Sequence, residues 1–440
     1  ISLLSPAAKV LERLILPFLK QSLPTHSTQH GFKSSHSTTS ALLPLSTAIA
    51  EGFNNSKPPA RTTAVAIDFS KAFDCIPLDS LLSKLSSSSL HHNIIRWLTS
   101  YLRGRRASCS YNHSLSRSRP VYFGVPQGSV ISPILSIAPD KSSVTLFTSA
   151  TKESKSHPQI FLNNELLPLE KSVKILGVTL DTHFTFSSHI SDIISRASSR
   201  LNILKALAGT FWGAQKETML FTYRTILRPI LTYAAPIWFP NTSQSNILKL
   251  QRIQNQALRT CLGAHQMSSL SHLHSESKYL PVQNHLHLLC TQFLASALRP
   301  DHPSHPVVTR PPLPRNQKQT LQSFCHTSIS PYLLPDGTIQ PTSYRSILQN
   351  LHYQAVQESI SSLDLNPVLN APAPEISISE SNLPRPYRSV LSQLRSSYCS
   401  KLLSYQHRID PTKTPSPSCP HCNLSDETTI HLFDCPSLPT

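Results

Sequence analysis

The sequence predicts an α+β protein of several domains that ends in a small Cys/His-rich tail, and three observations support this fold class. Short apolar, β-branched runs typical of strands occur between residues 64 and 181. Beyond residue 187 the apolar residues follow helical spacing over long stretches. Three cysteines then stand close together near the C-terminus. The length of 440 residues is enough for roughly three domains.

The charge balance is strongly basic, because acidic residues are scarce. Lys and Arg number 40 against 23 Asp and Glu, which leaves a net charge of +17. Charged residues make up only 14% of the chain, well below the usual quarter. This balance excludes an acidic binding protein and favours a polyanionic partner, either a nucleic acid or a membrane surface. The hydrophobic fraction of 39% argues against compositional disorder.

The N-terminal region is predicted to contain helices at residues 1–19 and 41–53, where apolar residues recur at helical spacing. The first of these segments carries charged residues and prolines, which argues against a signal peptide and against a membrane span. The nine cysteines are mostly scattered, so a disulfide framework is not expected. We therefore expect an intracellular protein, nuclear or cytoplasmic. Because the chain begins at Ile1 without a methionine, we interpret it as a fragment.

Strands and helices are predicted to alternate in the first part of the chain. Strands are expected at residues 64–69, which read as buried, and at 121–125, 144–148 and 173–181. Helices are expected from Asp79 and over residues 92–102. Asn163 and Asn164 fit the turn of a β-hairpin.

The second part of the chain is predicted to be helical. One apolar stripe at helical spacing consists of Ile190, Ile193, Ile194, Ala197, Leu201, Leu204 and Leu207. Further helices are expected over residues 215–233, 245–262 and 387–408. Residues 301–345 are rich in proline and histidine, and we interpret them as a linker. The Pro-rich stretch 310–315 fits a plain spacer better than a ligand for an adaptor domain.

Asp68 is the first residue that points to chemistry. It stands near the end of the predicted strand 64–69. A carboxylate at a strand end can bind Mg²⁺, which proteins hold with one or two carboxylates plus phosphate oxygens. The alternative is that Asp68 only caps the following turn, and this stretch alone favours that alternative.

Three motifs that include this stretch resemble those of reverse transcriptases of non-LTR retrotransposons, LINE-like and jockey-type. They are Gln-His-Gly-Phe-Lys at residues 29–33 with His-Ser-Thr at 36–38, the segment 64–74, and Gly-Val-Pro-Gln-Gly-Ser at 124–129 with Ser-Pro at 132–133. Their order and spacing match that family. The resemblance continues through residues 174–181, the helices up to Gly263 and the C-terminal Cys/His group. It implies a right-hand polymerase with fingers and palm, an α-helical thumb and a small zinc-binding tail.

The resemblance implies roles for individual residues. Asp68 would bind the catalytic Mg²⁺ ions, and Phe73 would lie under the sugar and reject a 2′-hydroxyl. Gln127 and Gly128 would contact the incoming nucleotide and the template. The implied reaction adds deoxynucleotides to a primer 3′-hydroxyl by two-metal catalysis on an RNA template with a DNA primer.

Three further residues have weaker assignments. Lys33 and Arg61 are candidate nucleic-acid phosphate contacts, although an exposed cation in so basic a chain is more often simply solvated. Asp74 matches the family motif but is not a metal ligand there, so capping of the turn is the better interpretation. Five cations of the predicted thumb either contact a phosphate backbone or form a solvated helix face, and both interpretations fit equally well. They are Arg196, Arg200, Lys205, Arg224 and Arg228.

One family motif is missing. The family has a Tyr-x-Asp-Asp hairpin, whose aspartates complete the metal site, several dozen residues after the Pro-Gln-Gly box. No Asp-Asp pair occurs anywhere in this sequence. Residues 132–136 run almost directly into 137–143, which resemble the segment beyond that hairpin, so an internal deletion or a falsely assigned intron is the simplest account. Asp140 follows a proline and has no partner acid, so we expect a solvated loop residue and a chain that does not polymerise.

These inferences give an expected domain plan. We expect fingers and the first part of the palm in residues 1–136, the remainder of the palm in 137–186, and a helical thumb and connection in 187–300. A Pro-rich linker (301–345), a helical segment (346–410) and a Cys/His tail (411–440) complete the plan.

The C-terminal tail contains a second candidate site. Cys419, Cys422, His431 and Cys435 have the spacing C-x2-C-x8-H-x3-C, which suits tetrahedral Zn²⁺. The alternative is a set of reduced thiols in an unstructured tail, but so short a segment needs a metal to fold. His421 lies inside the C-x2-C turn and is a poorer ligand candidate than His431.

Three classes of function remain open at this stage. The first is a catalytically defective reverse transcriptase from a transposable element. The second is a non-catalytic nucleic-acid-binding protein that uses the thumb helices and the zinc tail. The third is a decayed copy that never folds. The first two imply RNA or DNA as partner and no membrane.

Overall fold

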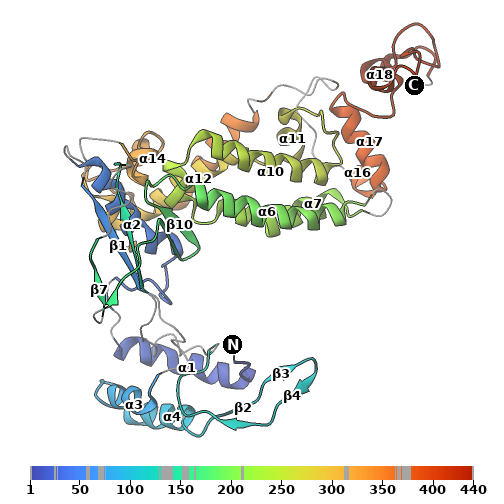
Figure 1. Cartoon of the computed structure of the whole chain (residues 1–440). Helices are drawn as coiled ribbons and strands as arrows, with labels where there is room; N and C mark the ends of the chain where they lie inside the picture. Colours follow the sequence, from blue (N-terminus) through green and yellow to red (C-terminus); the bar gives the residue numbers. More distant parts are fainter. Residues whose placement is uncertain are drawn as a thin grey trace. The chain divides into compact units, whose positions relative to one another are not determined.

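The computed structural model describes residues 2–23, 26, 28–55, 60–67, 74, 76–127, 129, 142–150, 158–162, 165–209, 213–311, 317–361, 363, 368 and 378–438. It contains both helices and sheets, which confirms the predicted mixture. The chain divides into two compact units, whose residues can be followed by their sequence colours in Figure 1. Unit 1 comprises Ile1–Ala41 and Arg61–Leu176, and unit 2 comprises Leu42–Ala60 and Gly177–Thr440.

Three helices of unit 1 share one apolar core. They are α1 (Pro6–Ser22), α3 (Leu78–Ser86) and α4 (His92–Leu102), and the last has the predicted bounds. Helix α1 begins where the Ser5 side chain accepts a hydrogen bond from the Ala8 N–H and Pro6 takes the first helical position. The fully buried members of the core are Leu19, Leu98 and Leu102.

Two small hairpins follow α4. Strand β2 (Arg106–Ala107) pairs with β5 (Arg119–Pro120), and β3 (Ser110–Tyr111) pairs with β4 (Ser114–Leu115). The strand expected at residues 121–125 does not form. Phe123 makes only an isolated bridge to Pro77, and Gly124 has a φ of 74°, which turns the backbone away from an extended path.

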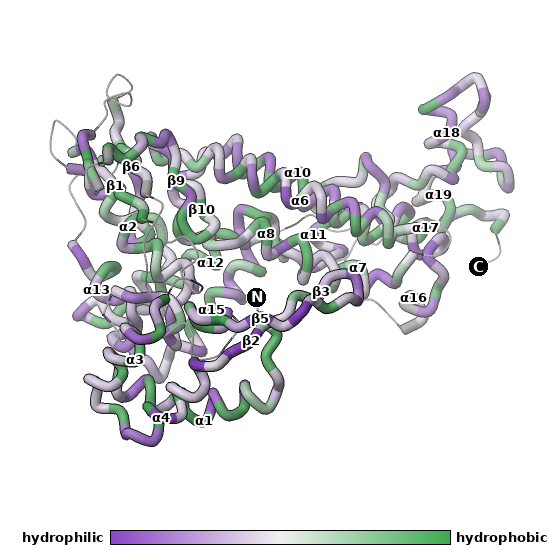
Figure 2. The backbone as a smooth tube through the Cα atoms, turned by 60° about the horizontal axis from the view of Figure 1, so that its bottom comes forward, coloured by the Kyte–Doolittle hydropathy of each residue, from purple (hydrophilic) through white to green (hydrophobic). Residues whose placement is uncertain are grey.

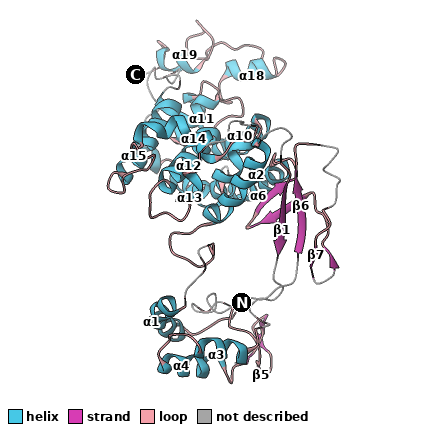
Figure 3. Cartoon of the chain, turned by 90° about the vertical axis from the view of Figure 1, so that its left-hand side faces the viewer, coloured by secondary structure: helices cyan, strands magenta, loops and turns pink. Residues whose placement is uncertain are grey.

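The strand before Asp68 is β1 (Thr62–Ile67), and it pairs antiparallel with β6 (Ser142–Phe147). Figure 3 shows the two strands side by side. The prediction of a buried strand is wrong, because half-buried and exposed residues alternate along β1. Val65 is 42% exposed and Ile67 is 52% exposed. In the described part of the chain the sheet has only these two strands, so one edge of β1 has no partner strand.

The remaining strands are short. Strand β7 (Phe161–Leu162) pairs with β8 (Glu165–Leu166), which confirms the predicted hairpin, while its turn residues Asn163 and Asn164 lie outside the described residues. The run predicted at residues 173–181 forms two strands, β9 (Ser172–Ile175) and β10 (Val178–Asp181). The chain turns between them because Leu176 and Gly177 both have positive φ.

Apart from β10, unit 2 is largely helical, as the many helices in the upper part of Figure 3 show. Helix α2 (Thr38–Asn54) enters it at Leu42. Helix α6 (Ser187–Leu207) lies beside α10 (Gln244–Leu262), as seen in Figure 1. The predicted stripe of α6 is confirmed in its buried residues Ile190, Ile193, Ala197, Leu201 and Leu204. Figure 2 shows the matching alternation of hydrophobic and hydrophilic residues along both helices.

The helix predicted over residues 215–233 forms in three pieces. They are α7 (Lys216–Thr222), a π-helical turn η2 (Tyr223–Leu227) and α8 (Arg228–Thr232). The Arg228 N–H donates to the Tyr223 carbonyl, five residues back. Pro229 has no N–H to continue the ordinary pattern, which accounts for the wider turn at this place.

The rest of unit 2 is a series of helices. Helix α12 (Val282–Ala297) packs against α14 (Leu321–Ile329) and α15 (Tyr344–Val356). Residues 321–329 were expected to be linker, yet Leu321, Cys325 and Ile329 are buried, so this part of the expected linker is packed. The other helical elements are α9 (Ala235–Trp238), η3 (Phe239–Asn241), α11 (Leu270–Ser277), α13 (His305–Val308), η4 (Ser330–Tyr332), η5 (Gln357–Ser361) and α16 (Ile378–Asn382).

The C-terminal helices are short. The helix predicted over residues 387–408 is divided into α17 (Arg385–Arg395) and α18 (Leu403–Ile409), and α19 (Thr429–Asp434) lies in the Cys/His tail. Among the described helices, none combines the length and the apolar character needed to cross a membrane.

Buried charges connect four of these helices. Lys216 Nζ lies 2.6 Å from Glu276 Oε1 and 3.7 Å from Glu380 Oε1. Arg395 contacts the same two acids, at 3.0 Å from Glu276 Oε1 and 2.9 Å from Glu380 Oε2. The four side chains come from α7, α11, α16 and α17, so their ion pairs hold the C-terminal helices against the rest of unit 2.

Candidate functional site

The residues expected to form the metal and nucleotide site stand between β1 and β6 in the sequence. Asp68, Phe73, Gly128 and Asp140 all lie outside the described residues. The described strands on either side of them are nevertheless paired, because Ile67, the last residue of β1, is opposite Ser142, the first residue of β6. Where the described chain resumes at Ser142, it therefore lies beside the end of β1.

The loop that carries Gln127 is held by hydrogen bonds within unit 1. The Arg105 guanidinium donates to the carbonyls of Leu102 (2.8 Å), Phe123 (3.1 Å) and Gly124. Burial of this guanidinium lowers the pKa of Arg105. At the other end of the loop the Ser2 N–H donates to the Gln127 carbonyl at 2.6 Å. The backbone is thus fixed, while the Gln127 side chain is exposed and available to a ligand.

The two expected phosphate contacts differ in their surroundings. Lys33 is half-buried, and its ammonium donates to the His26 carbonyl at 2.6 Å within its own loop. Arg61 is exposed and stands immediately before β1. Asp74 is exposed as well, in a turn.

The four predicted zinc ligands meet in the structure. The ligand atoms of Cys419, Cys422, His431 and Cys435 all lie within 4.8 Å of one another. Cys419 Sγ is 3.8 Å from Cys435 Sγ, and Cys422 Sγ is 3.2 Å from His431 Nε2. His421 lies outside this group, as expected.

Local turns bring the four residues together. The Asn423 N–H donates to the Cys419 carbonyl at 2.9 Å, and Asn423 takes a positive φ, which closes the turn between the first two cysteines. The Cys419 N–H in turn donates to the Ser425 carbonyl at 2.8 Å. The Thr428 side chain accepts from the His431 N–H and begins α19, so that His431 faces the turn.

The thiols of the group differ in their electrostatic surroundings, which favour the metal-binding thiolate at Cys422 but not at Cys435. The Leu424 N–H donates to Cys422 Sγ at 3.4 Å, and this hydrogen bond lowers the pKa of the Cys422 thiol. Burial raises the pKa of the Cys435 thiol. Three thiols and one imidazole at this spacing fit the tetrahedral donor set of a structural Zn²⁺ site.

Two residues that the sequence analysis did not single out support the cluster. Ser425 Oγ lies 2.8 Å from His431 Nδ1, which fixes the ring and leaves Nε2 directed at Cys422. Glu427 joins the tail to α18, because its carboxylate accepts from the Leu403 N–H at 2.6 Å and its carbonyl accepts from the Ser404 hydroxyl at 2.7 Å. No spacing rule marks either residue, since both act through contacts that form only after folding.

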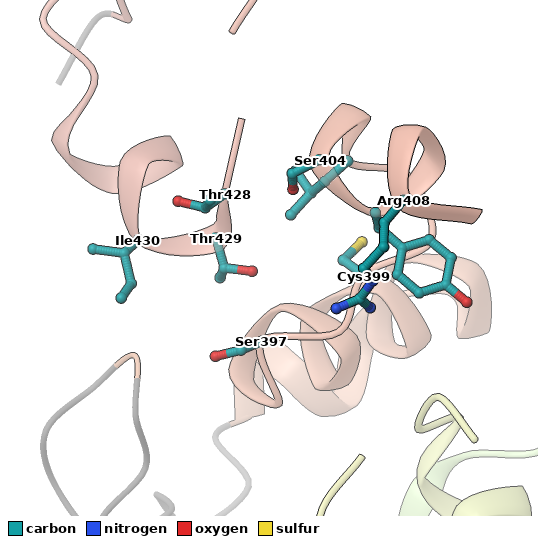
Figure 4. A pocket seen from close by; sticks show the side chains of 9 residues that line it. Ser397, Cys399, Ser404, Arg408, Thr428, Thr429 and Ile430 are labelled. Carbon is teal, nitrogen blue, oxygen red and sulfur yellow. The ribbon is translucent and has the colours of Figure 1, made fainter. Parts of the chain in front are cut away.

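A pocket lies beside the cluster, between α18 and the start of α19. Its cavity measures about 300 Å³, and Figure 4 shows Ser404 and Arg408 on one side and Thr428, Thr429 and Ile430 on the other. The Arg408 guanidinium lies over the rings of Tyr398 and Tyr405, at 5.7 and 5.5 Å from the two centroids. Two aromatic rings therefore already contact this cation.

Comparison with known proteins decides the family. Residues 1–138 match the family model described as "Reverse transcriptase (RNA-dependent DNA polymerase)". In these residues the chain carries a reverse transcriptase domain, and its relatives resemble it as LINE-like members of that family. The matched region contains the Gln-His-Gly, Asp68 and Pro-Gln-Gly motifs on which the resemblance was based.

The relatives of this reverse transcriptase come from fly transposons. It is 27% identical over 335 residues to a probable RNA-directed DNA polymerase from transposon BS of Drosophila melanogaster, covering 59% of this chain and 35% of that protein. It is 25% identical over 394 residues to that from transposon X-element of the same fly, covering 72% and 43%. Identity to the jockey polymerase of D. melanogaster is 23%, covering 60% and 35%. The chain thus spans well under half the length of these curated relatives.

Proposed function

We propose that this chain is a defective RNA-directed DNA polymerase of a non-LTR retrotransposon. In this family, Mg²⁺ ions stabilise the attacking and leaving oxygens as a deoxynucleotide joins the primer 3′-hydroxyl. Asp68 would supply one carboxylate, Phe73, Gln127 and Gly128 would bind the nucleotide, and residues 187–300 would form the thumb. The observation that carries the proposal is the lack of any Asp-Asp pair in the sequence, which leaves the metal site without its second anchor.

Two findings support an internal deletion as the cause. The match to the family model ends at residue 138, next to the point where the Ser-Pro box meets the segment that resembles the far side of the hairpin. In addition, β6 pairs directly with β1 immediately after this point. Loss of the two strands of the hairpin would explain why β1 has exposed apolar residues and an edge without a partner strand.

Primer extension tests the defect. The purified chain, given Mg²⁺, an RNA template, a DNA primer and deoxynucleotides, is expected to make no product. The matched control is the same chain with a family Tyr-x-Asp-Asp hairpin inserted between Ser136 and Ile137. Template-dependent synthesis by the unmodified chain would refute the proposal.

The transcript tests the origin of the defect. Amplification and sequencing across the codons for residues 135–140 distinguishes a real lesion from a falsely assigned intron. A product that matches the short junction supports a real lesion. A longer product that encodes the hairpin in frame shows that the native protein has a complete metal site.

A second candidate function is nucleic-acid binding without catalysis, favoured by the convergence of four metal ligands in the tail. Zn²⁺ held by Cys419, Cys422, His431 and Cys435 would supply the folding energy of a tail too short to build its own core. We expect one zinc per chain, which a chelator releases. Metal analysis of Cys422→Ser should show none, while Cys109→Ser, which alters an exposed thiol elsewhere, should keep it. Zinc-free wild-type protein after purification in zinc would contradict the proposal.

A further inference from the structure

A basic pocket lies in unit 2 at the π-helical turn. Its cavity measures about 460 Å³ and is lined by residues of η2, α8, α11, α12 and α15 and of the loop after α11. Five of these residues are basic, three of them cations and two of them histidines, and none of the described lining residues is acidic. The five are Arg224, Arg228, Lys278, His285 and His352. A concave site with this composition attracts an anion.

Arg228 is the central cation of the pocket. The π-turn and Pro229 fix its backbone at the start of α8. Its guanidinium carbon lies 5.0 Å from the centroid of the Tyr279 ring, so one face of the cation rests on an aromatic side chain. The Arg228 Nε is buried and, within the described structure, has no hydrogen-bond acceptor. The stacking on Tyr279 explains the position of the guanidinium but leaves this donor unused.

His285 presents a second unused polar atom. It lies in the first turns of α12, and its buried Nδ1 finds no partner in the part of the chain that the structure describes. Burial, together with the charges of Arg228 and His352, lowers the pKa of His285 to about 3. The ring is therefore neutral near pH 7 and can donate one N–H to an acceptor.

A tightly held anion would complete this arrangement. A water molecule can accept from Arg228 Nε, but it cannot offset the charges that face the pocket. A phosphate group can do both, because its oxygens accept several hydrogen bonds and carry negative charge, and arginine is the residue best suited to bind it. The exposed Arg224 and Lys278 extend the same positive surface outward from the cavity.

We propose that this pocket binds a phosphate group of a single-stranded nucleic acid, with Arg224, Arg228 and His285 as its ligands. Phosphate oxygens are the chemistry recognised, and a free phosphate or nucleotide would offer the same atoms. The exposed cations beside the cavity favour a chain of phosphates over a single one. The inference concerns binding alone and does not depend on polymerase activity.

Binding of a fluorescein-labelled oligothymidylate to the full chain, measured by anisotropy at several salt concentrations, tests the proposal. Arg224 is exposed, so Arg224→Gln should leave the fold intact, which a thermal melt checks. This variant is expected to weaken binding and to reduce the slope of log K against log salt by about 0.7, the value for one single-strand phosphate contact. Arg228→Gln should act in the same way, and Arg228→Lys should restore part of the affinity.

Arg345→Gln is the matched control, since Arg345 is an exposed arginine on α15 that does not line the pocket. It should leave the slope unchanged. Titration with inorganic phosphate alone, followed by ³¹P line broadening, distinguishes a nucleic-acid phosphate from a free phosphate as the ligand. If Arg224→Gln weakens phosphate binding but not oligonucleotide binding, the nucleic-acid assignment is overturned in favour of a free phosphate ligand. If Arg224→Gln matches Arg345→Gln in both titrations, the phosphate site itself is overturned.

Discussion

Ser425 shows how much of the metal cluster depends on one hydroxyl. Its Oγ lies 2.8 Å from His431 Nδ1 and fixes the orientation of the ring, while His431 Nε2 faces Cys422 Sγ at 3.2 Å. Such outer contacts set the tautomer and the basicity of a ligating imidazole. The arrangement of the four ligands is therefore held by a residue that would bind no metal itself.

Ser425→Ala should accordingly weaken zinc binding about 10- to 100-fold without abolishing it. Competition with a zinc-sensitive dye measures the affinity. Ser416→Ala is the control, because Ser416 is an exposed serine of the same tail that does not contact His431. Equal affinities of the two variants would contradict the assigned role.

At the level of elements, the buried ion pairs between α7, α11, α16 and α17 predict a measurable contribution to stability. Lys216 and Glu276 are 7% and 0% exposed and only 2.6 Å apart. Removing Lys216 leaves the two buried carboxylates of Glu276 and Glu380 with Arg395 as their remaining cation, and breaking a buried ionic contact in this way costs up to about 3–5 kcal/mol. Lys216→Met should therefore lower the free energy of unfolding of unit 2 by that amount in a urea titration.

The control for this change is the exposed pair of Arg103 and Asp79, which are 59% and 89% exposed. Asp79→Asn should cost less than about 1 kcal/mol, because solvent screens the interaction. A loss at Lys216 no larger than the loss at Asp79 would show that the buried network does not hold the helices together.

The same network predicts a pH dependence. Burial alone would raise the pKa of Glu276, but Lys216 and Arg395 outweigh it and hold the pKa below its ordinary value of 4.5. Because the folded pKa lies below the unfolded one, the stabilisation is complete above about pH 4.5 and is lost as the pH falls through the lower, folded value. Urea midpoints measured from pH 6 to below pH 4.5 should show this loss in the wild type and not in Glu276→Gln. Glu217→Gln, at an exposed position of α7, should behave as the wild type.

The elements also show what the sequence can and cannot predict. The bounds of α4 and the buried stripe of α6 follow from local periodicity, and the Cys/His cluster follows from ligands that are close in sequence. The strand expected at residues 121–125 fails because Gly124 turns the backbone. The burial expected of β1 fails because burial depends on neighbouring strands, not on composition. Arg228 and His285 are far apart in sequence, so no spacing rule could bring them to one pocket.

At the scale of the whole molecule, each unit has its own hydrophobic core. The core of unit 1 includes Leu98, which is fully buried, while Trp238 and Tyr223 are among the largest fully buried side chains in unit 2. Separate cores allow separate unfolding transitions, so one free energy of unfolding does not describe the chain.

Leu98→Ala is expected to destabilise unit 1 by about 2–5 kcal/mol, the usual cost of a cavity left by a buried leucine. Differential scanning calorimetry should show one transition move and the other stay in place. Leu115→Ala, at a side chain that is 76% exposed, should move neither. A single transition that shifts as a whole would show that the two units unfold together.

The unpaired edge of β1 affects how copies of the protein associate with one another. Val65 and Ile67 expose apolar surface on a strand of six residues that, among the described residues, is covered by a partner strand on one side only. Such an edge is a template on which a strand of another copy can add. The net charge of +17 keeps copies apart at low ionic strength, and salt screens that repulsion. The unpaired edge of β1 is thus one place where copies of the protein can associate as the salt concentration rises.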